Sequence, residues 1–313
     1  MKLRLLVRLR VARTFSIAVL AMTAGALDAS GQNPSAQPNP AAADWSGVEQ
    51  AIGRKGAPNP GGVIRFSFPR SDLSVTVGGV ALKPALALGS WVAFKELGAG
   101  QAMAMGDLVL TEDEVSPVMA ALQEGGVEQT ALHNHVLKES PRVMYMHILA
   151  HGDPSKIART IHDALGRSGT PLGPASPLSA TSASDLDTAG IARALGLAGK
   201  LNGVVYQVTV PRSEKIMEMG TEVPPSMGVA TAINFQPTGG GKAAITGDFV
   251  LRASEVNPVI RALRENRIEV TAVHSHMLDE EPRLFFMHFW ANDDAVQLAR
   301  GVRAALDRTA SKK

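Results

Sequence analysis

The chain has 313 residues, of which 45% are hydrophobic and 19% are charged, and its formal net charge at pH 7 is +2. This composition is typical of a folded protein, and the length favours two domains or one duplicated domain. The sequence contains no cysteine, which excludes disulfides, thiolate metal sites, a cysteine nucleophile and a lipid-bearing N-terminal cysteine. Any bound metal ion must therefore be held by nitrogen and oxygen atoms.

Residues 1–29 have the pattern of a secretory signal peptide. Five basic residues precede an apolar run from Phe15 to Ala26, which is too short to span a bilayer, and small residues at Ala24, Ala26 and Ala29 offer cleavage points. Removing this segment takes away five of the 31 basic and one of the 29 acidic residues, which leaves 26 against 28. We therefore expect a periplasmic or secreted protein without a basic surface for nucleic acid or anionic membranes.

Internal repetition is the strongest signal in the sequence. Residues 106–147 align without a gap on residues 247–288, with 22 identities in 42 positions. The match extends outward, for example from VIRFSFPR at 63–70 to VYQVTVPR at 205–212. The repetition predicts two homologous units related by pseudo-twofold symmetry.

Composition sets the expected boundaries of these units. The two repeats are expected at residues 45–168 and 188–313. Residues 30–44, and residues 169–187, which are rich in Pro, Ser, Thr and Ala, read as linkers.

Hydrophobic periodicity gives the expected elements of the first unit in chain order. A short helix is expected over 48–53, followed by strands over 63–68, within 74–83 about a Gly78-Gly79 turn, near 90–96 and over 101–110. Ser116-Pro117, and Asn257-Pro258 in the second unit, have the pattern of an N-cap followed by proline at the first helical position. Each unit is thus expected to be α+β, a mostly antiparallel sheet with helices packed on it.

A final helix is expected to begin at Asp153-Pro154 and to end at Gly166. Its apolar positions Ile157, Ile161 and Leu165 are spaced by four residues. The corresponding helix of the second unit carries the same spacing at Leu298, Val302 and Leu306.

Three of the eight histidines lie within ALHNHVLKESPRVMYMH at 131–147. In a strand, alternate residues point to the same face, so His133 and His135 can converge on one ion. If the chain turns at Lys138 to Pro141, a hairpin register that pairs His133 with His147 adds a third imidazole to the same face. The spacing therefore predicts a three-histidine metal site.

Glu139 lies in or beside the expected turn, where it can act as a fourth ligand or as a base on bound water. The second unit repeats every polar element of this pattern at identical spacing: His274, His276, Glu280 and His288. The sequence thus predicts one such site in each repeat. Imidazole and carboxylate ligands suit a divalent transition metal, with zinc as first choice and iron, manganese, nickel or copper as alternatives.

Other polar residues near the motif have candidate supporting roles. Asp107 and Asp248 stand at equivalent points, where each can orient a histidine from outside the ligand set or serve as a turn or capping residue. Arg142 and Arg283 begin the return strands on the opposite face, where a salt bridge or another structural role is favoured.

The histidine pattern has alternative interpretations. The repeated residues can preserve a structural hairpin that packs against its twin, or form a metal-free catalytic or ligand-binding cluster. The H-x-H-x3-E spacing also resembles the first motif of cupins, but here a helix directly precedes the motif strand.

Three segments carry a resemblance to a known family: LALGSWVAFK at 86–95, MGDLVLTEDEVSPVMAAL at 105–122 and ALHNHVLKESPRVMYMHILAHGDP at 131–154. They resemble the LppY/LpqO family of exported bacterial proteins over almost all of the chain that follows the expected signal peptide. The resemblance implies an exported, duplicated α+β protein and supplies no chemistry. Named members are mycobacterial lipoproteins, whereas this chain lacks the lipid-accepting cysteine.

Three functions remain open from the sequence. The first is an exported protein that binds a transition metal, alone or with a small anionic ligand, through its His/Glu hairpins. The second is a metal-dependent hydrolase or oxygenase that uses Glu139 or Glu280 as general base. The third is a structural or partner-binding protein whose histidine hairpins form the interface between the repeats.

Overall fold

A computed structural model describes residues 43–173 and 185–312. The predicted signal peptide, nearly all of the linker at 30–44 and the central part of the linker at 169–187 lie outside the described residues. In the described ranges, no helix has both the length and the hydrophobicity that a membrane crossing requires.

Two successive sets of elements make up the described chain. The first comprises α1 (Ser46–Ile52), β1 (Ala57–Asn59), β2 (Val63–Pro69), β3 (Thr76–Val77), β4 (Val80–Ala81), α2 (Pro84–Ala87), β5 (Gly89–Gly98), β6 (Gln101–Thr111), α3 (Glu112–Glu124), β7 (Glu128–His133), β8 (Glu139–Ser140), β9 (Val143–Gly152) and α4 (Pro154–Leu165). The second comprises α5 (Thr188–Leu195), β10 (Lys200–Asn202), β11 (Val205–Pro211), β12 (Met217–Glu218), β13 (Thr221–Glu222), η1 (Pro225–Met227), β14 (Ala230–Gly239), β15 (Lys242–Leu251), α6 (Ala253–Glu265), β16 (Glu269–His274), β17 (Phe285–Asp294) and α7 (Ala295–Leu306).

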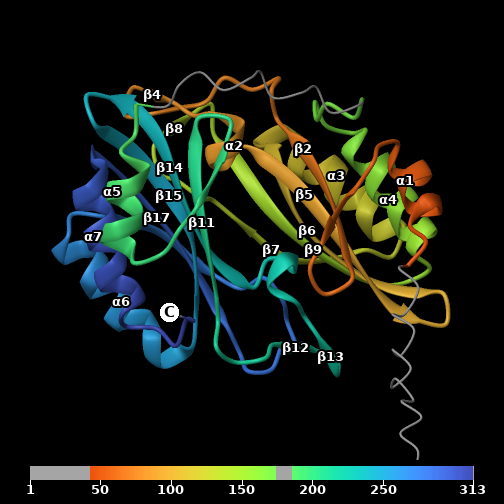
Figure 1. The fold of residues 1–313 in the computed structure, drawn as a ribbon. Helices are drawn as coiled ribbons and strands as arrows, with labels where there is room; N and C mark the ends of the chain where they lie inside the picture. Colours follow the sequence, from red (N-terminus) through yellow and green to blue (C-terminus); the bar gives the residue numbers. More distant parts are fainter. Residues whose placement is uncertain (1–42, 174–184, 313) are drawn as a thin grey trace, which may run out of the picture. The chain divides into compact units, whose positions relative to one another are not determined.

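Each repeat is built around one six-stranded antiparallel sheet (Figure 1). The strand order is β1-β2-β5-β6-β9-β7 in the first repeat and β10-β11-β14-β15-β17-β16 in the second, so equivalent strands occupy equivalent places. The predicted duplicated α+β fold with mostly antiparallel sheets is confirmed.

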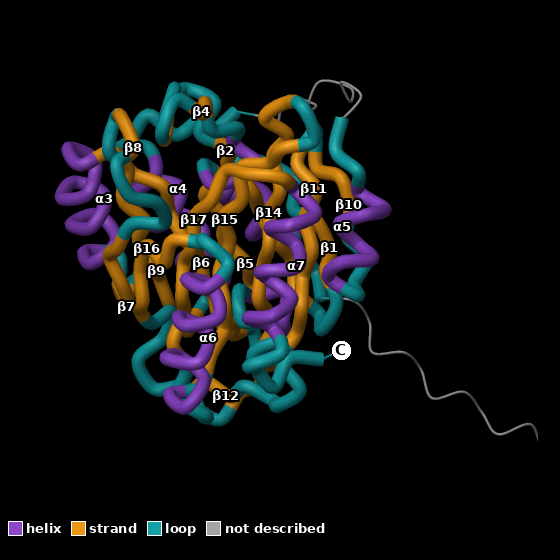
Figure 2. Tube along the Cα trace, turned by 90° about the vertical axis from the view of Figure 1, so that its left-hand side faces the viewer, coloured by secondary structure: helices purple, strands orange, loops and turns teal. Residues whose placement is uncertain are grey.

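The helices of each repeat cover one face of its own sheet, and strand periodicity decides which residues face them. In β2, Ile64, Phe66 and Phe68 are buried in the core beneath the helices of the first repeat. Arg65 and Ser67 alternate with them and point to the opposite face, because successive side chains of a strand point to opposite sides. Figure 2 shows α6 and α7 lying over the sheet of the second repeat in the same way.

Two helices begin earlier than the sequence predicts. The helix expected at Ser116-Pro117 starts at Glu112, because Thr111 and Glu114 form a capping box that satisfies the first backbone N–H groups. Pro117 therefore lies inside α3, and Pro258 lies inside α6 for the same reason, since Glu255 accepts the backbone N–H of Arg252. The predicted starts of both helices were wrong.

The inner faces of the two sheets pack against residues of the other repeat. One buried cluster joins Met105 and Leu149 to Met277 and Phe286. Two hydrogen bonds cross the contact reciprocally, from Thr130 Oγ1 to the His276 carbonyl and from Thr271 Oγ1 to the His135 carbonyl, each at 2.6 Å. Because these two bonds join equivalent residues in opposite directions, they follow the predicted pseudo-twofold symmetry.

Candidate metal centre between the repeats

The histidines lie on the inner faces of the sheets, but in a different register from the predicted one. His133 pairs with Tyr145, and Ala131 pairs with His147. The predicted direct pairing of His133 with His147 was therefore wrong by two residues. An even shift keeps both side chains on one face. His135 follows the end of β7 and lies in the connecting segment rather than in the strand.

The predicted turn is a longer excursion that draws the glutamates away from the histidines. Glu139 lies in β8, which pairs with β3, and its Oε1 is 3.9 Å from Arg142 Nε. Glu280 Oε1 accepts the backbone N–H of Leu284 at 2.8 Å, and Oε2 lies 3.1 Å from Arg283 Nη1. The structure thus places both arginines beside glutamates and brings neither glutamate into the groups of candidate ligands described below.

Six imidazole rings converge where the repeats meet. His133 and His274, which are equivalent residues, stack on each other with centroids 3.6 Å apart. His135 stacks on His288 at 3.9 Å, and its equivalent His276 stacks on His147 at 3.7 Å. These pairs join opposite repeats, so the two histidine sets form one composite cluster rather than the two separate sites that the sequence suggested.

Aromatic side chains hold the outer rings of the cluster. Tyr145 stacks on His135 with centroids 3.3 Å apart, and its equivalent Phe286 stacks on His276 at 3.4 Å. Tyr145 Oη also donates to the Ala87 carbonyl at 2.9 Å. Each outer imidazole is therefore fixed between an aromatic ring of its own repeat and a histidine of the other.

Backbone carbonyls determine which ring nitrogen carries the proton. Nδ1 of His288 lies 2.7 Å from the Gly247 carbonyl, and Nδ1 of His276 lies 3.2 Å from the Gly228 carbonyl. His133 and His274 make the equivalent contact with the carbonyl of the next residue, at 3.1 Å. Since a carbonyl only accepts, Nδ1 of these four rings is the donor and Nε2 carries the free lone pair.

The Nε2 atoms of all six rings are buried, and none makes a hydrogen bond of good geometry within the described part of the chain, although His276 Nε2 lies 3.0 Å from Asp248 Oδ2. Buried polar atoms without partners are rare in folded proteins because desolvation costs free energy that no contact returns. Ligating histidines show this same arrangement, with one ring nitrogen on a carbonyl and the other on the ion.

Two aspartates border the cluster from the neighbouring strands. Asp107 pairs with His147 across β6 and β9, and Asp248 pairs with His288 across β15 and β17. Asp248 Oδ2 lies 3.0 Å from His276 Nε2, and Asp107 Oδ2 lies 3.4 Å from His135 Nε2. The carboxylates thus face the Nε2 side of the rings, whereas a partner that orients a ligating histidine would contact its Nδ1.

Burial keeps the centre uncharged when no cation is present. It lowers the pKa of His274 to about 2 and that of His276 to about 3, and neighbouring imidazoles add to the effect on His274. Burial also raises the pKa of Asp107, and that of Asp248 far above its usual range. Neutral imidazoles are the form that binds metal, and two carboxyl groups in the same pocket favour a cation beside them.

Three overlapping groups of side chains place their candidate ligand atoms within 4.8 Å of one another. They are His133, His147 and His274; His133, His135 and His288; and Asp248, His274 and His276. Every group contains His133 or His274, and two of the groups combine histidines of both repeats. The central pair is therefore shared by the whole centre.

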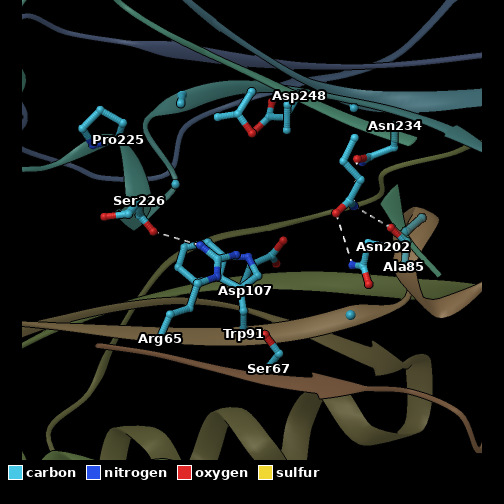
Figure 3. A pocket seen from close by; sticks show the side chains of 18 of the residues that line it. Arg65, Ser67, Ala85, Trp91, Asp107, Asn202, Pro225, Ser226, Asn234 and Asp248 are labelled. Atoms are coloured by element: carbon cyan, nitrogen blue, oxygen red, sulfur yellow. Dashed lines mark hydrogen bonds between the residues drawn. The ribbon is translucent and has the colours of Figure 1, made fainter. Parts of the chain in front are cut away.

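A cavity of about 980 Å³ opens beside the histidines and is walled by both repeats. Asp107, Asp248 and four of the histidines line it, and neither Glu139 nor Glu280 does. Sequence reasoning missed its side walls, formed by Arg65, Ser67 and Trp91 of the first repeat and by Asn202, Gln207 and Asn234 of the second. Figure 3 labels all of these residues except Gln207. The alternation of β2 and β11, applied beyond the histidine motif, is the signal that places Arg65 and Gln207 on the inner faces.

Comparison with known proteins informs the family but not the chemistry. No curated protein matches the chain. Among solved structures, the trimeric bacterial microcompartment shell protein PduB aligns at 13% identity over 81% of this chain and 89% of its own, with a TM-score of 0.20. EtuB from Clostridium kluyveri aligns at 10% identity over 81% and 91%, with a TM-score of 0.19. Both scores are too low for either likeness to inform the fold or the function.

The family comparison instead covers most of the chain. The family model described as Domain of Unknown Function (DUF1259) matches residues 46–167 and again residues 189–308. These two ranges coincide with the two sheets and their helices. The chain therefore belongs to this family, with one copy of the domain in each repeat.

Proposed function

We propose that this chain is an exported protein that binds a divalent transition metal at the composite centre between its repeats. One observation carries the proposal: six Nε2 atoms and the Oδ1 atoms of Asp107 and Asp248 are buried without hydrogen-bond partners among the described residues. A metal ion satisfies such atoms together, because it accepts several lone pairs at one point. Export rests on the sequence pattern of residues 1–29, in line with the LppY/LpqO resemblance.

Zinc remains the first choice, with iron, manganese, nickel and copper as alternatives. The candidate groups offer imidazole nitrogen and, in one group, a carboxylate oxygen. This donor set suits zinc and the other late divalent metals, and calcium or magnesium would require more oxygen ligands.

Metal analysis of protein purified without a histidine tag tests the proposal directly. We expect stoichiometric metal in the wild type, and loss of that metal in the double variant His133→Ala/His274→Ala, because every candidate group loses at least one ligand. His151→Ala is the matched control, since His151 is exposed and lies outside the groups. Circular dichroism should show that the double variant stays folded, because its helix faces and sheet cores are unchanged.

Absence of any divalent metal bound with at least micromolar affinity at pH 7.5 would overturn the proposal. Retention of full stoichiometry by the double variant would also overturn it. Either outcome leaves the histidines as a structural interface between the repeats, which was the third function considered from the sequence.

The cavity favours a second candidate, a metal-dependent enzyme of hydrolase or oxygenase type. Asp107 and Asp248 line the cavity beside the histidines, whereas Glu139 and Glu280 do not, so the base in this proposal is an aspartate. A carboxylate near a metal-bound water can accept its proton. The test is a panel of ester and phosphoester substrates with zinc-loaded protein. Asp107→Asn, which leaves every candidate ligand group intact, should lower kcat while the metal content stays constant.

A further inference from the structure

The two walls of the cavity carry different residues at equivalent positions. Arg65 in β2 corresponds to Gln207 in β11, because each is the third residue of equivalent strands, both of which end at a proline that is followed by arginine. Trp91 in β5 faces Asp107 across the ladder as Ala232 in β14 faces Asp248, so these two residues also correspond. The first wall thus has a cation on an aromatic ring where the second has an amide and a methyl group.

The polar side chains of the second wall are already engaged with protein. Gln207 Nε2 donates to the Ala85 carbonyl and to Asn234 Oδ1, both at 3.0 Å, and Gln207 Oε1 accepts from Asn202 Nδ2 at 3.2 Å. Asn234 Nδ2 donates to the Leu86 carbonyl at 3.3 Å. This wall is a closed amide network with little capacity left for a ligand.

Arg65 keeps most of its N–H donors free to bind a ligand. Its Nη1 donates to the Ser226 carbonyl at 2.9 Å, and its guanidinium lies 3.9 Å from the centroid of the Trp91 ring. Among the described residues it forms no ion pair with a carboxylate, although a guanidinium offers five N–H donors. Burial lowers the pKa of Arg65 to about 10, so the group stays charged at neutral pH.

Contacts around Gly228 connect Arg65 to the histidine centre. A Cβ atom on Gly228 would lie 2.8 Å from the Trp91 ring and 3.9 Å from His276 Nδ1, so the backbone passes closely between these side chains. The Gly228 carbonyl accepts from His276, and Ser226 two residues earlier accepts from Arg65. Figure 3 shows Arg65, Trp91 and Asp107 together on one side of the cavity, with Asp248 opposite.

We propose that the cavity binds a small organic acid whose single carboxylate group lies against Arg65 while another part of the molecule reaches the metal centre. A carboxylate matches the forked donors of a guanidinium, and the Trp91 face fixes the plane of that fork. The cavity volume lies near the upper end of the roughly 300–1,000 Å³ that small-molecule pockets occupy.

Charge supports a ligand with one negative charge. With a divalent ion in place and both aspartates ionised, the ion, Arg65 and the two carboxylates leave one uncompensated positive charge. A monocarboxylate neutralises it, which a buried site favours over an excess of either sign. This inference rests on the proposed metal centre, but Arg65 itself does not depend on the metal.

The experiment compares lactate with its uncharged analogue lactamide by isothermal titration calorimetry on zinc-loaded and metal-free full-length protein. Wild-type zinc-loaded protein should bind lactate at least about tenfold more tightly than lactamide, which corresponds to about 1.4 kcal/mol. Arg65→Gln should weaken lactate binding by at least about tenfold, because it removes the guanidinium. The metal content should stay unchanged, because the second repeat already carries glutamine at the equivalent position. Arg193→Gln, at an exposed position of α5, is the matched control and should bind as the wild type does.

Three outcomes would overturn the assignment: no lactate binding to the wild type, equal binding of lactate and lactamide, or undiminished binding to Arg65→Gln with its metal content intact. Tight binding of inorganic phosphate without lactate binding would replace the carboxylate by another oxyanion. If the wild type holds no metal, the metal proposal fails and the proposed role of Arg65 is still open to test. Lactate binding to that metal-free protein, and its loss in Arg65→Gln, then decides the role of Arg65 separately.

Discussion

The two parts of the central cavity differ in symmetry. We call the six clustered histidines with Asp107 and Asp248 the floor, and the side chains of β2, β5, β11 and β14 that line the cavity the walls. On the floor, each histidine and aspartate of one repeat has an identical equivalent in the other, and the ring contacts repeat in matched pairs at 3.7 and 3.9 Å. On the walls, Arg65 stands against Gln207 and Trp91 against Ala232. The residues that are identical in both repeats suit a function that needs both copies. The residues that differ between the repeats suit a function that holds a ligand in one orientation. We interpret the floor as the ion site and the walls as the part that distinguishes ligands.

The largest predicted effect is on stability, and it tests whether equivalent buried ion pairs stabilise the two repeats equally. Arg70 is fully buried and contacts Asp72 and Glu114 at 2.8 Å, and Arg212 contacts Glu214 and Glu255 at 2.8 and 2.7 Å in the same way. Arg70→Ala and Arg212→Ala should each lower the free energy of unfolding by about 3–5 kcal/mol, because each change leaves half-buried carboxylates without their partner.

Urea denaturation measures both of these variants, and the two losses should agree within about 1 kcal/mol. A large loss in one repeat alone would show that the repeats contribute unequally to stability. Exposed Arg193→Ala should change little, since its ion pair with Asp187 spans 3.9 Å at the surface.

The second prediction breaks the symmetry of the floor. His133→Ala/His135→Ala and His274→Ala/His276→Ala each remove ligands from two of the three candidate groups, including the group of His133, His147 and His274 that joins the repeats. Each double variant should therefore reduce the metal affinity of the protein, on the order of 100-fold. Zinc titration with a competing chelator measures the affinity. Two independent sites, as the sequence alone suggested, would instead leave half the metal bound at wild-type affinity in each double variant.

The third prediction concerns metal-free protein and pH. Six buried histidines have a pKa below its usual value, down to about 2 for His274 and about 3 for His276. In the unfolded chain these histidines bind protons near pH 6.5, whereas in the folded chain they stay neutral until the pH is much lower. The stability that is present above pH 6.5 is therefore lost as the pH falls. Asp107 and Asp248 have a raised pKa and act in the opposite sense, but they are two groups against six.

We expect a net loss on the order of 1.4 kcal/mol or more per pH unit below pH 6.5. Thermal unfolding between pH 7.5 and pH 5 measures it. The variant His133→Ala/His274→Ala should show a shallower slope, because it removes two of the six groups. An unchanged slope would assign the acid sensitivity to residues outside the centre.

The sequence predicts the fold better than the site, and particular residues explain why. The period-four pattern places Ile157 and Ile161 in the core correctly, because burial beneath the helices is a property of each repeat alone. The period-two pattern of a strand places His133 and His147 on one face. It does not reveal that His133 stacks on His274, since that contact depends on how two separate sheets pack. The glutamates were misplaced because Glu139 pairs through β8 with β3, a contact 62 residues away in sequence that no local turn pattern encodes.

The last prediction concerns a small asymmetry at the edge of the floor, where Tyr145 stands against Phe286. Tyr145→Phe makes the repeats identical at this position and removes the bond to the Ala87 carbonyl, which should cost about 1 kcal/mol of stability. Stacking on His135 survives because the ring is retained, so zinc affinity should stay within about twofold of the wild type. The reverse change, Phe286→Tyr, places a hydroxyl in a fully buried apolar cluster and should cost at least as much. If Tyr145→Phe lowers zinc affinity strongly while stability barely changes, the hydroxyl belongs to the metal centre rather than to the packing around it.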